Sequence, residues 1–251
     1  RCSYSSLGSA WWRASLNDVN PHSDGLAVGS ALFEFGPDDQ IKHRDRVRDL
    51  AEVYTHYREV TAMLDLVPGM FPTEDNPDNI DKTFLEPAAG HGNFLVEILR
   101  RKLAVVTTAR YRGEEFEHRI LRCLVSIYGI DIDSENVDDS RRRLRAVIAA
   151  HAGDPTTRTE GFWSAVDAIL TTNIVRADTL ADAQVIELVS YQPGTAGTFV
   201  REWSTLEQPE PDSQLDLFAT LPDEPQRDEI PVHYTQLAAN PKPTAATGRK
   251  R

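Results

Sequence analysis

Cysteine and long apolar runs are scarce in this sequence of 251 residues. Cys2 and Cys123 are its two cysteines, which is too few for a disulfide framework or a cysteine-based zinc site and is typical of a reducing compartment. No apolar run approaches the ~20 residues of a membrane-spanning helix, and no signal peptide is visible. We therefore expect a cytoplasmic protein with no membrane segment.

Positive charge is also in short supply. Lysine and arginine number 27 against 39 aspartates and glutamates, so the formal net charge is −12 at pH 7. A chain of this charge repels nucleic acid as a whole, and DNA binding would need a local basic face or a partner subunit. The run Arg141–Arg143 with Arg145 is a candidate basic face, but we interpret it as the solvated side of a helix. The seven histidines have no metal-ligand spacing, so no metal site is expected.

Composition divides the chain into three parts. Residues 1–45 scatter aromatic residues among small polar ones and turn helical near their end, and we predict an N-terminal arm there. Residues 46–205 alternate helix and strand patterns, which is typical of an α/β domain with a parallel sheet. Residues 206–251 are rich in acidic residues and proline, which predicts an irregular, disordered tail. Within that tail, Leu215, Leu217 and Phe218 are a candidate docking segment.

Hydrophobic periodicity places the elements of the middle part. Apolar residues at helical spacing predict helices around residues 60–67, 94–102, 116–124, 137–148 and 162–170. Short apolar runs predict parallel strands that end near residue 86 and at 127–133 and 173–178. Residues 185–191 and 198–203, joined by a Pro-Gly turn, predict an antiparallel hairpin. We expect Ser134 to cap the helix that follows the second strand.

The stretch FLEPAAGHGNFL, residues 84–95, carries the strongest functional signal. A strand end, two glycines and an immediate helix bring bare backbone and helix N-terminal amides close to a ligand. The dinucleotide fingerprint would require a third glycine where this chain has Leu95. Glu86, at the strand end, disfavours a pyrophosphate and suits a cationic ligand with an α-amino group. S-adenosylmethionine, with its sulfonium and α-ammonium groups, fits this charge better than NAD.

This stretch resembles the cofactor motif of amino-group (adenine-specific) DNA methyltransferases, usually worded Asp-Pro-Ala-Cys-Gly-Ser-Gly-Asn-Phe-Leu. The matching residues are Gly90, Gly92, Asn93, Phe94 and Leu95, while Glu86, Ala89 and His91 replace Asp, Cys and Ser. The resemblance implies a Rossmann-like S-adenosylmethionine-dependent methyltransferase fold, with a helical N-terminal arm and an irregular acidic C-terminal tail. It further implies methyl transfer to N6 of adenine in DNA, as in restriction-modification or phage-defence systems.

Three further segments are similar to motifs of the same family, in the expected order. Residues 46–68 resemble the segment that closes over the methionine end of the cofactor, although His56 stands where proline is usual. Residues 128–133 resemble the second strand, whose acid holds the ribose and whose next residue packs on adenine. Residues 173–178 resemble the third strand, with its acid near the adenine amino group. The cofactor-binding residues implied are Val53, Tyr54, Thr55, Glu86, Pro87, Ala88, Gly90, Gly92, Asn93, Asp131, Ile132 and Asp178.

A purely structural role is also open for each of these residues. The glycine turn can be a purely structural strand-to-helix turn, and Asp131 can merely cap a helix. Tyr54 and Thr55 can be ordinary packing residues, and an acid after a strand, such as Asp178, is common. We interpret His91 as a solvent-facing turn residue.

The family's catalytic motif, a polar residue followed by Pro-Pro and an aromatic residue, is missing. The sequence contains no Pro-Pro pair, and Asn20, Asn76 and Asn240 each precede a single proline without the aromatic residue. The catalytic residues therefore stay unassigned, and three explanations are open. The catalytic part lies on a partner chain or a missing domain, which would also help to bind DNA in a hetero-oligomer. In the second explanation the chain is a non-catalytic cofactor-binding subunit. In the third, Asn240 takes the place of the polar residue of the catalytic motif. A methyltransferase acting on a substrate other than DNA is a further alternative.

Overall fold

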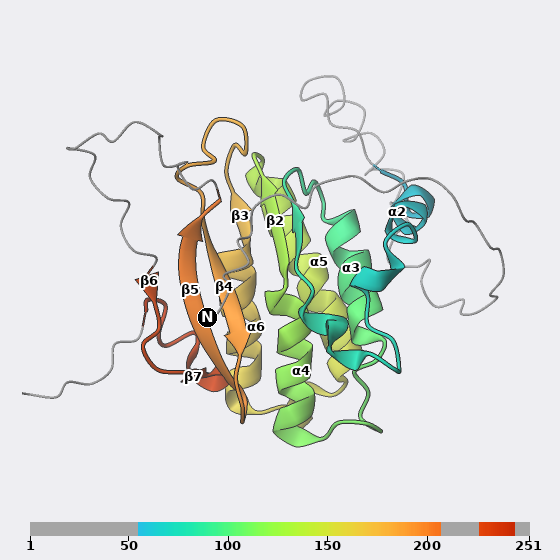
Figure 1. Ribbon diagram of the computed structural model, residues 1–251, viewed down its shortest axis with the longest axis vertical. Coiled ribbons are helices and arrows are strands. Elements are labelled where there is room, and N and C mark those ends of the chain that lie inside the picture. The colour runs from blue at the N-terminus through green and yellow to red at the C-terminus, as the bar shows by residue number, and fades with distance from the viewer. Residues whose placement is uncertain (1–54, 207–225, 244–251) are drawn as a thin grey trace, which may run out of the picture. The chain divides into compact units, whose positions relative to one another are not determined.

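The computed structural model describes residues 55–206 and 226–243, all within the unit Glu52–Arg251 (Figure 1). The predicted arm, Val53, Tyr54 and the candidate docking segment 215–218 lie outside the described residues.

A three-stranded parallel sheet forms the first part of the fold. Its strands are β1 (Phe84–Glu86), β2 (Ile127–Asp131) and β3 (Ile174–Arg176), in the spatial order β1-β2-β3. Leu85 lies opposite Tyr128, and Gly129 lies opposite Ile174. The three strands predicted from short apolar runs are confirmed, and the chain has an α/β fold with a parallel sheet.

Within the described residues, five α-helices accompany the strands, as the apolar spacing predicts. They are α2 (Tyr57–Leu64), α3 (Asn93–Leu103), α4 (Gly113–Val125), α5 (Ser134–Ala152) and α6 (Glu160–Asn173). Short 3₁₀ turns occupy Pro68–Met70, Pro77–Asp81, Pro155–Thr157 and Tyr234–Gln236. The predicted cap of α5 is wrong by one residue: Asp133 is the cap and its side chain accepts a hydrogen bond from the Glu135 amide, because its backbone is extended.

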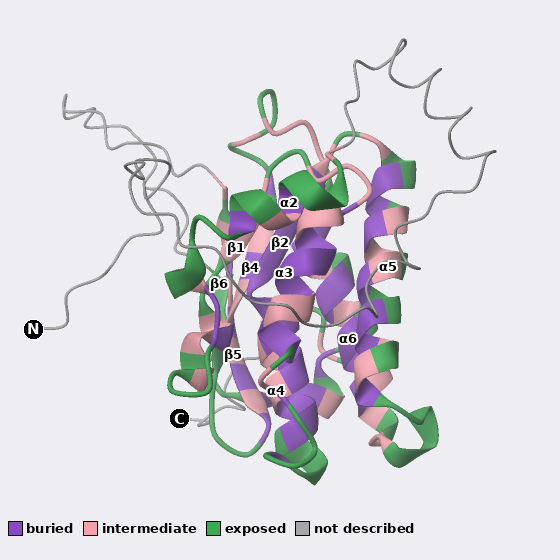
Figure 2. Ribbon diagram, turned by 90° about the vertical axis from the view of Figure 1, so that its right-hand side faces the viewer, coloured by how far each residue is buried: buried purple, intermediate pink, exposed green. Residues whose placement is uncertain are grey.

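The helices form two packed pairs. Helices α3 and α5 pack on each other and on β2, where Gly129 leaves room: a Cβ at that position would lie 2.6 Å from the Leu95 side chain. Helices α4 and α6 pack on each other and on the hairpin strand β4. Figure 2 shows the buried residues concentrated where these helices meet the strands. The core is therefore shared by both sheets.

The predicted hairpin is confirmed. Strands β4 (Glu187–Pro193) and β5 (Thr198–Thr205) pair antiparallel, with Val189 opposite Trp203. Both of these side chains are buried, as the alternation of apolar and polar residues along a half-buried strand requires.

The prediction of a disordered tail is wrong for residues 226–243. Strands β6 (Gln226–Arg227) and β7 (Val232–His233) both pair with β5. Buried Asp228 accepts three hydrogen bonds from Arg201, one from its amide and two from its guanidinium. The acidic composition of the tail misled the prediction, because this aspartate is matched by a buried arginine instead of being solvated.

The same segment is held by a second set of contacts. Tyr234 is fully buried, and its hydroxyl donates to the buried Glu117 carboxylate at 2.6 Å. Glu117 also accepts from the amide and the hydroxyl of Thr159. Gly161 allows the chain to come this close, since a Cβ there would lie 2.5 Å from the Thr235 Cβ. Residues 226–243 therefore complete the core of the domain.

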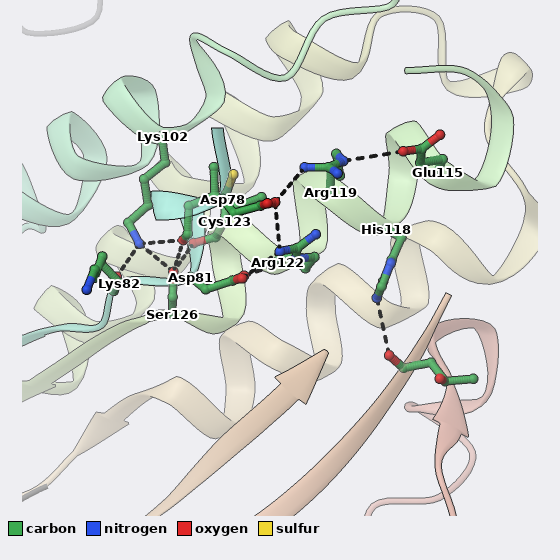
Figure 3. Close-up of polar contacts among 12 residues, drawn as sticks. Asp78, Asp81, Lys82, Lys102, Glu115, His118, Arg119, Arg122, Cys123 and Ser126 are labelled. Carbon is green, nitrogen blue, oxygen red and sulfur yellow. Dashed lines mark hydrogen bonds and ion pairs between the residues drawn. The ribbon is translucent and has the colours of Figure 1, made fainter. Parts of the chain in front are cut away.

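Buried polar groups close the amino end of the parallel sheet (Figure 3). Lys102 is fully buried, and its ammonium donates to the carbonyls of Ile80 and Lys82 and to the Ser126 hydroxyl. Burial lowers the pKa of Lys102 to about 8. Its three donors have three acceptors, so the group is saturated by structural contacts.

Candidate functional site at the carboxyl end of the parallel sheet

Loops from all three parallel strands meet at the carboxyl end of the sheet. The Gly90 amide, after β1, donates to the Asp131 carboxylate, at the end of β2, over 2.8 Å. The Thr179 hydroxyl, after β3, donates to the Pro87 carbonyl over 2.7 Å. Gly90 and Asp131, predicted from two separate motifs, are thus brought together, and the loop after the third predicted strand joins them through Thr179. This edge is where ligands bind in open parallel sheets.

The two glycines of the turn have different roles. Both have positive φ, 52° at Gly90 and 77° at Gly92, which favours glycine at each position. A Cβ on Gly92 would lie 2.7 Å from the Ser140 hydroxyl, so Gly92 lets α5 pack against the turn. A Cβ on Gly90 would meet no atom within 4 Å. Gly90 is the glycine whose surroundings are open to a ligand.

Glu86 is a half-buried carboxylate with little to compensate its charge. Among the described residues, its one hydrogen bond comes from the Ala88 amide at 3.2 Å, and no cation forms an ion pair with it. Burial raises the pKa of Glu86, and the Ala88 hydrogen bond opposes that rise only in part. The neighbouring residues Pro87 and Ala88 are exposed. A ligand cation at this position would supply the missing partner.

Asp131 lies where the sequence places it, but most of its acceptor capacity is used. One carboxylate oxygen accepts from the Asp133 amide at 2.9 Å and from the Asn136 side chain at 3.1 Å. The other accepts from the Gly90 amide. A carboxylate offers about four acceptor positions, so one is left for a ligand hydroxyl. Asp131 is both a structural tie and a candidate ligand contact.

Apolar side chains are exposed beside these carboxylates. Ile132 is 63% exposed directly after β2, and Leu180 is 97% exposed in the loop after β3. Large apolar side chains that are exposed at the carboxyl end of the parallel sheet are candidate contacts for a flat, apolar part of a ligand.

Asp178 shapes its own loop. One oxygen of its carboxylate accepts from the amides of Leu180 and Ala181, at 2.9 and 3.1 Å. This is a local turn of the kind that aspartate forms with the residues that follow it. The structural interpretation of Asp178 therefore accounts for its contacts, and its second oxygen has no described protein donor.

Asn93 and Thr55 are hydrogen-bonded to each other beside the glycine turn, so the Asn93 side chain is not free to contact a ligand. The Asn93 amide group donates to the Thr55 carbonyl at 3.0 Å, and its oxygen accepts from Arg143 at 2.8 Å. Arg143 also donates to the His91 carbonyl. The Asn93 side chain is thus occupied by protein contacts at both ends, so its contribution to a ligand site is the position it gives the helix start.

The expectation that His91 faces solvent is wrong. Its side chain is 13% exposed and pairs with Asp139 at 3.0 Å.

The arginine run is solvated in part. The side chains of Arg142 and Arg145 are 69% and 46% exposed, as expected. Arg141 instead donates to the Ile174 carbonyl and Arg143 to the His91 carbonyl, so these two arginines tie α5 to the parallel sheet and to the glycine turn.

Thr179 and Arg143 were missed by reasoning from the sequence. Arg143 follows Asp139 by four residues, so both lie on one face of α5, and that spacing could have indicated a shared target. The Thr179 contact joins loops 92 positions apart, and no pattern in the sequence indicates it.

Asn240 is held elsewhere in the fold. Its side chain donates to the Gln236 carbonyl at 2.9 Å, and its own carbonyl accepts from Arg201 of β5. These partners belong to the antiparallel sheet and the segment packed on it, so the structure does not bring Asn240 to the carboxyl-end loops.

Within the described residues, no group of three or more histidine, cysteine or acidic side chains is placed to hold a metal ion. In the same residues no helix is long and apolar enough to cross a membrane. No family model, curated protein or solved structure matches the chain.

Proposed function

We propose that the carboxyl end of the parallel sheet binds S-adenosylmethionine. We further propose that the chain is the cofactor-binding part of a DNA adenine-N6 methyltransferase of a restriction-modification or phage-defence system. The observation that carries the proposal is Glu86, a half-buried carboxylate without a cationic partner among the described residues, next to a turn that is open at Gly90.

Charge favours this cofactor over a nucleotide with a pyrophosphate. A pyrophosphate beside the Glu86 carboxylate would be repelled, whereas an α-ammonium group would be attracted and would replace the solvation that Glu86 loses on burial. The exposed Ile132 side chain offers an apolar surface to the adenine ring, and Asp131 keeps one acceptor for a ribose hydroxyl. When bound, the cofactor supplies an electrophilic methyl group on a sulfonium.

The assignment of DNA adenine as acceptor comes from the resemblance of the motifs, and two alternatives remain beside it. A non-catalytic cofactor-binding subunit is favoured by the missing Pro-Pro-aromatic motif and by the formal charge of −12. A methyltransferase for another substrate would use the same cofactor residues. In all three, the residues of this chain bind and orient the cofactor, and the acceptor is held by groups outside the described residues.

Calorimetric titration of S-adenosylmethionine into the full-length chain tests the proposal. We expect wild type to bind and Glu86→Gln to bind at least ten-fold more weakly, because the neutral amide loses the charge attraction, and ten-fold corresponds to about 1.4 kcal/mol. Glu160→Gln, at an exposed acid in the first turn of α6, is the matched control and should bind as wild type does.

The absence of binding by folded wild type, or equal affinity of wild type and Glu86→Gln, would refute the cofactor assignment. Methyl transfer to adenine-containing DNA, to adenine-free DNA and to protein then separates the acceptor alternatives. Transfer only to the adenine-containing duplex supports the DNA assignment.

A further inference from the structure

The outer edge of β1 has backbone groups that pair with no other strand of residues 55–206 and 226–243. The Phe84 amide donates to the Ser126 carbonyl at 2.9 Å, so in the parallel register residues 84 and 86 face β2. The amide and carbonyl of Leu85 must then point away from β2. No described segment pairs with that side, because β1 is the terminal strand of the sheet.

The opposite edge of the same sheet carries a charged side chain on one of its outward carbonyls. On β3, the outward carbonyl of Ile174 accepts hydrogen bonds from two nitrogens of the Arg141 guanidinium, at 3.0 and 2.6 Å. A charged side chain placed on an edge is a common protection against pairing with another chain. Among the described residues no side chain protects Leu85 in this way. The β3 edge thus has a charged cap, and Leu85 on the β1 edge has no pairing partner in the described part of the chain.

The direction of the strand connections points to the same edge. The chain passes from β1 to β2 to β3 in one direction, and then leaves the parallel sheet for the antiparallel hairpin β4–β5. Ligand sites of open parallel sheets lie where the strand order reverses, between two strands whose connections run to opposite sides. A reversal beside Glu86 would require another strand on the outer edge of β1.

We infer that a second, positively charged polypeptide adds one strand in parallel to the outer edge of β1. The inference rests on the proposed function. A strand added in parallel ends at the same edge as β1, so the residues after it would lie beside Glu86 and the glycine turn and hold the methyl acceptor there. The partner carries positive charge because this chain, at −12, repels DNA and attracts a basic protein.

This partner is favoured over the described C-terminal segment, which is already fixed elsewhere. Residues 226–243 pair with β5 and are locked by the Arg201–Asp228 ion pair. The described part of the chain therefore has no segment left to pair with Leu85.

Leu85→Pro is the decisive variant. Proline removes the outward amide of Leu85 and blocks an added strand, but it removes no hydrogen bond to β2, and edge strands tolerate proline at such positions. Leu85→Ala is the matched control, since it shortens the same side chain and keeps the amide.

The full-length chain is co-expressed with the polypeptide encoded beside it, and complexes are analysed by size-exclusion chromatography with light scattering. We expect a 1:1 complex for wild type and for Leu85→Ala, and at least a ten-fold loss of affinity for Leu85→Pro. No complex with wild type, or a complex that tolerates Leu85→Pro, overturns the inference.

Two measurements on the isolated chain complete the test. Hydrogen exchange at the Leu85 amide should be fast; protection would mean that residues of this chain or a second copy cover the edge, and would overturn the inference. S-adenosylmethionine binding by Leu85→Pro should equal that of wild type. If the variant binds the cofactor and the partner experiment fails, the strand inference falls while the proposed function stands.

Discussion

The two ends of the parallel sheet differ in how completely their polar groups are satisfied. At the amino end, the Lys102 ammonium has three acceptors and Arg122 pairs with Asp81 at 2.5 Å (Figure 3). At the carboxyl end, Glu86 has one amide donor and the outward amide of Leu85 has no described partner. Buried polar groups are normally hydrogen-bonded. Polar groups that lack a described partner therefore mark the carboxyl end as the candidate site for a ligand or a partner chain.

The largest expected effect lies at the amino end. Lys102→Met fills similar space but removes the donor of the Lys82 carbonyl and of the Ser126 oxygen, while the Ile80 carbonyl keeps the Ser126 hydroxyl as a donor. Each buried group left unsatisfied costs about 1–3 kcal/mol. We expect a loss of about 2–4 kcal/mol in the free energy of unfolding, measured by urea denaturation. Lys82→Met, at an exposed side chain, is the control. A loss below ~1 kcal/mol for Lys102→Met would mean that this end is not held by its polar contacts.

The next effect separates the two glycines of the turn. Gly92→Ala combines a positive φ with a clash against Ser140, whereas Gly90→Ala has the positive φ alone. We expect destabilisation of about 2–3 kcal/mol for Gly92→Ala and about 1 kcal/mol for Gly90→Ala. In calorimetry, Gly90→Ala should nevertheless impair cofactor binding more than its stability loss explains. Equal stability losses would contradict the distinct roles assigned to the two positions.

The smallest effect on stability is expected at Glu86. Burial raises the pKa of this carboxyl in the folded chain, so above its unfolded-state pKa the folded state binds more protons, and stability falls as pH rises through the folded-state pKa. Glu86→Gln should therefore leave stability unchanged, or raise it by about 0.5 kcal/mol at pH 7. The difference from wild type should shrink on acidification, as thermal unfolding at several pH values can check. A destabilised variant at neutral pH would contradict the unpaired state of Glu86.

Much of the carboxyl-end site could be predicted from short sequence patterns. Gly90, Gly92 and Glu86 follow an apolar strand and precede an amphipathic helix, and these local signals are enough to place a glycine turn at a strand end. Asp131 reaches the same edge because parallel strands share their direction. These patterns involve residues that are close in the sequence, so they can be recognised without knowing the rest of the fold.

The remaining features depend on contacts between distant residues. Tyr234 is buried and donates to Glu117, and the absence of a side chain at Gly161 lets the adjacent residue Thr235 come close, but nothing in the surrounding acidic, proline-rich sequence indicates these contacts. Asn93 has the residue type of a ligand contact, but Thr55 and Arg143 occupy its side chain. Contacts between residues far apart in the sequence decide the role of each of these side chains. Composition and spacing along the sequence therefore could not predict those roles.

Arg141 has a consequence for assembly. Strand addition between proteins leads to open-ended aggregation when both edge strands of a sheet are unpaired, because each added molecule then presents another unpaired edge and a fibre grows. Here the Arg141 guanidinium occupies the outward carbonyl of Ile174 on β3, whereas Leu85 on β1, the opposite terminal strand, has no described partner. If a partner strand pairs with β1 as we infer, we expect the parallel sheet to take up one strand and form a 1:1 heterodimer instead of a fibre.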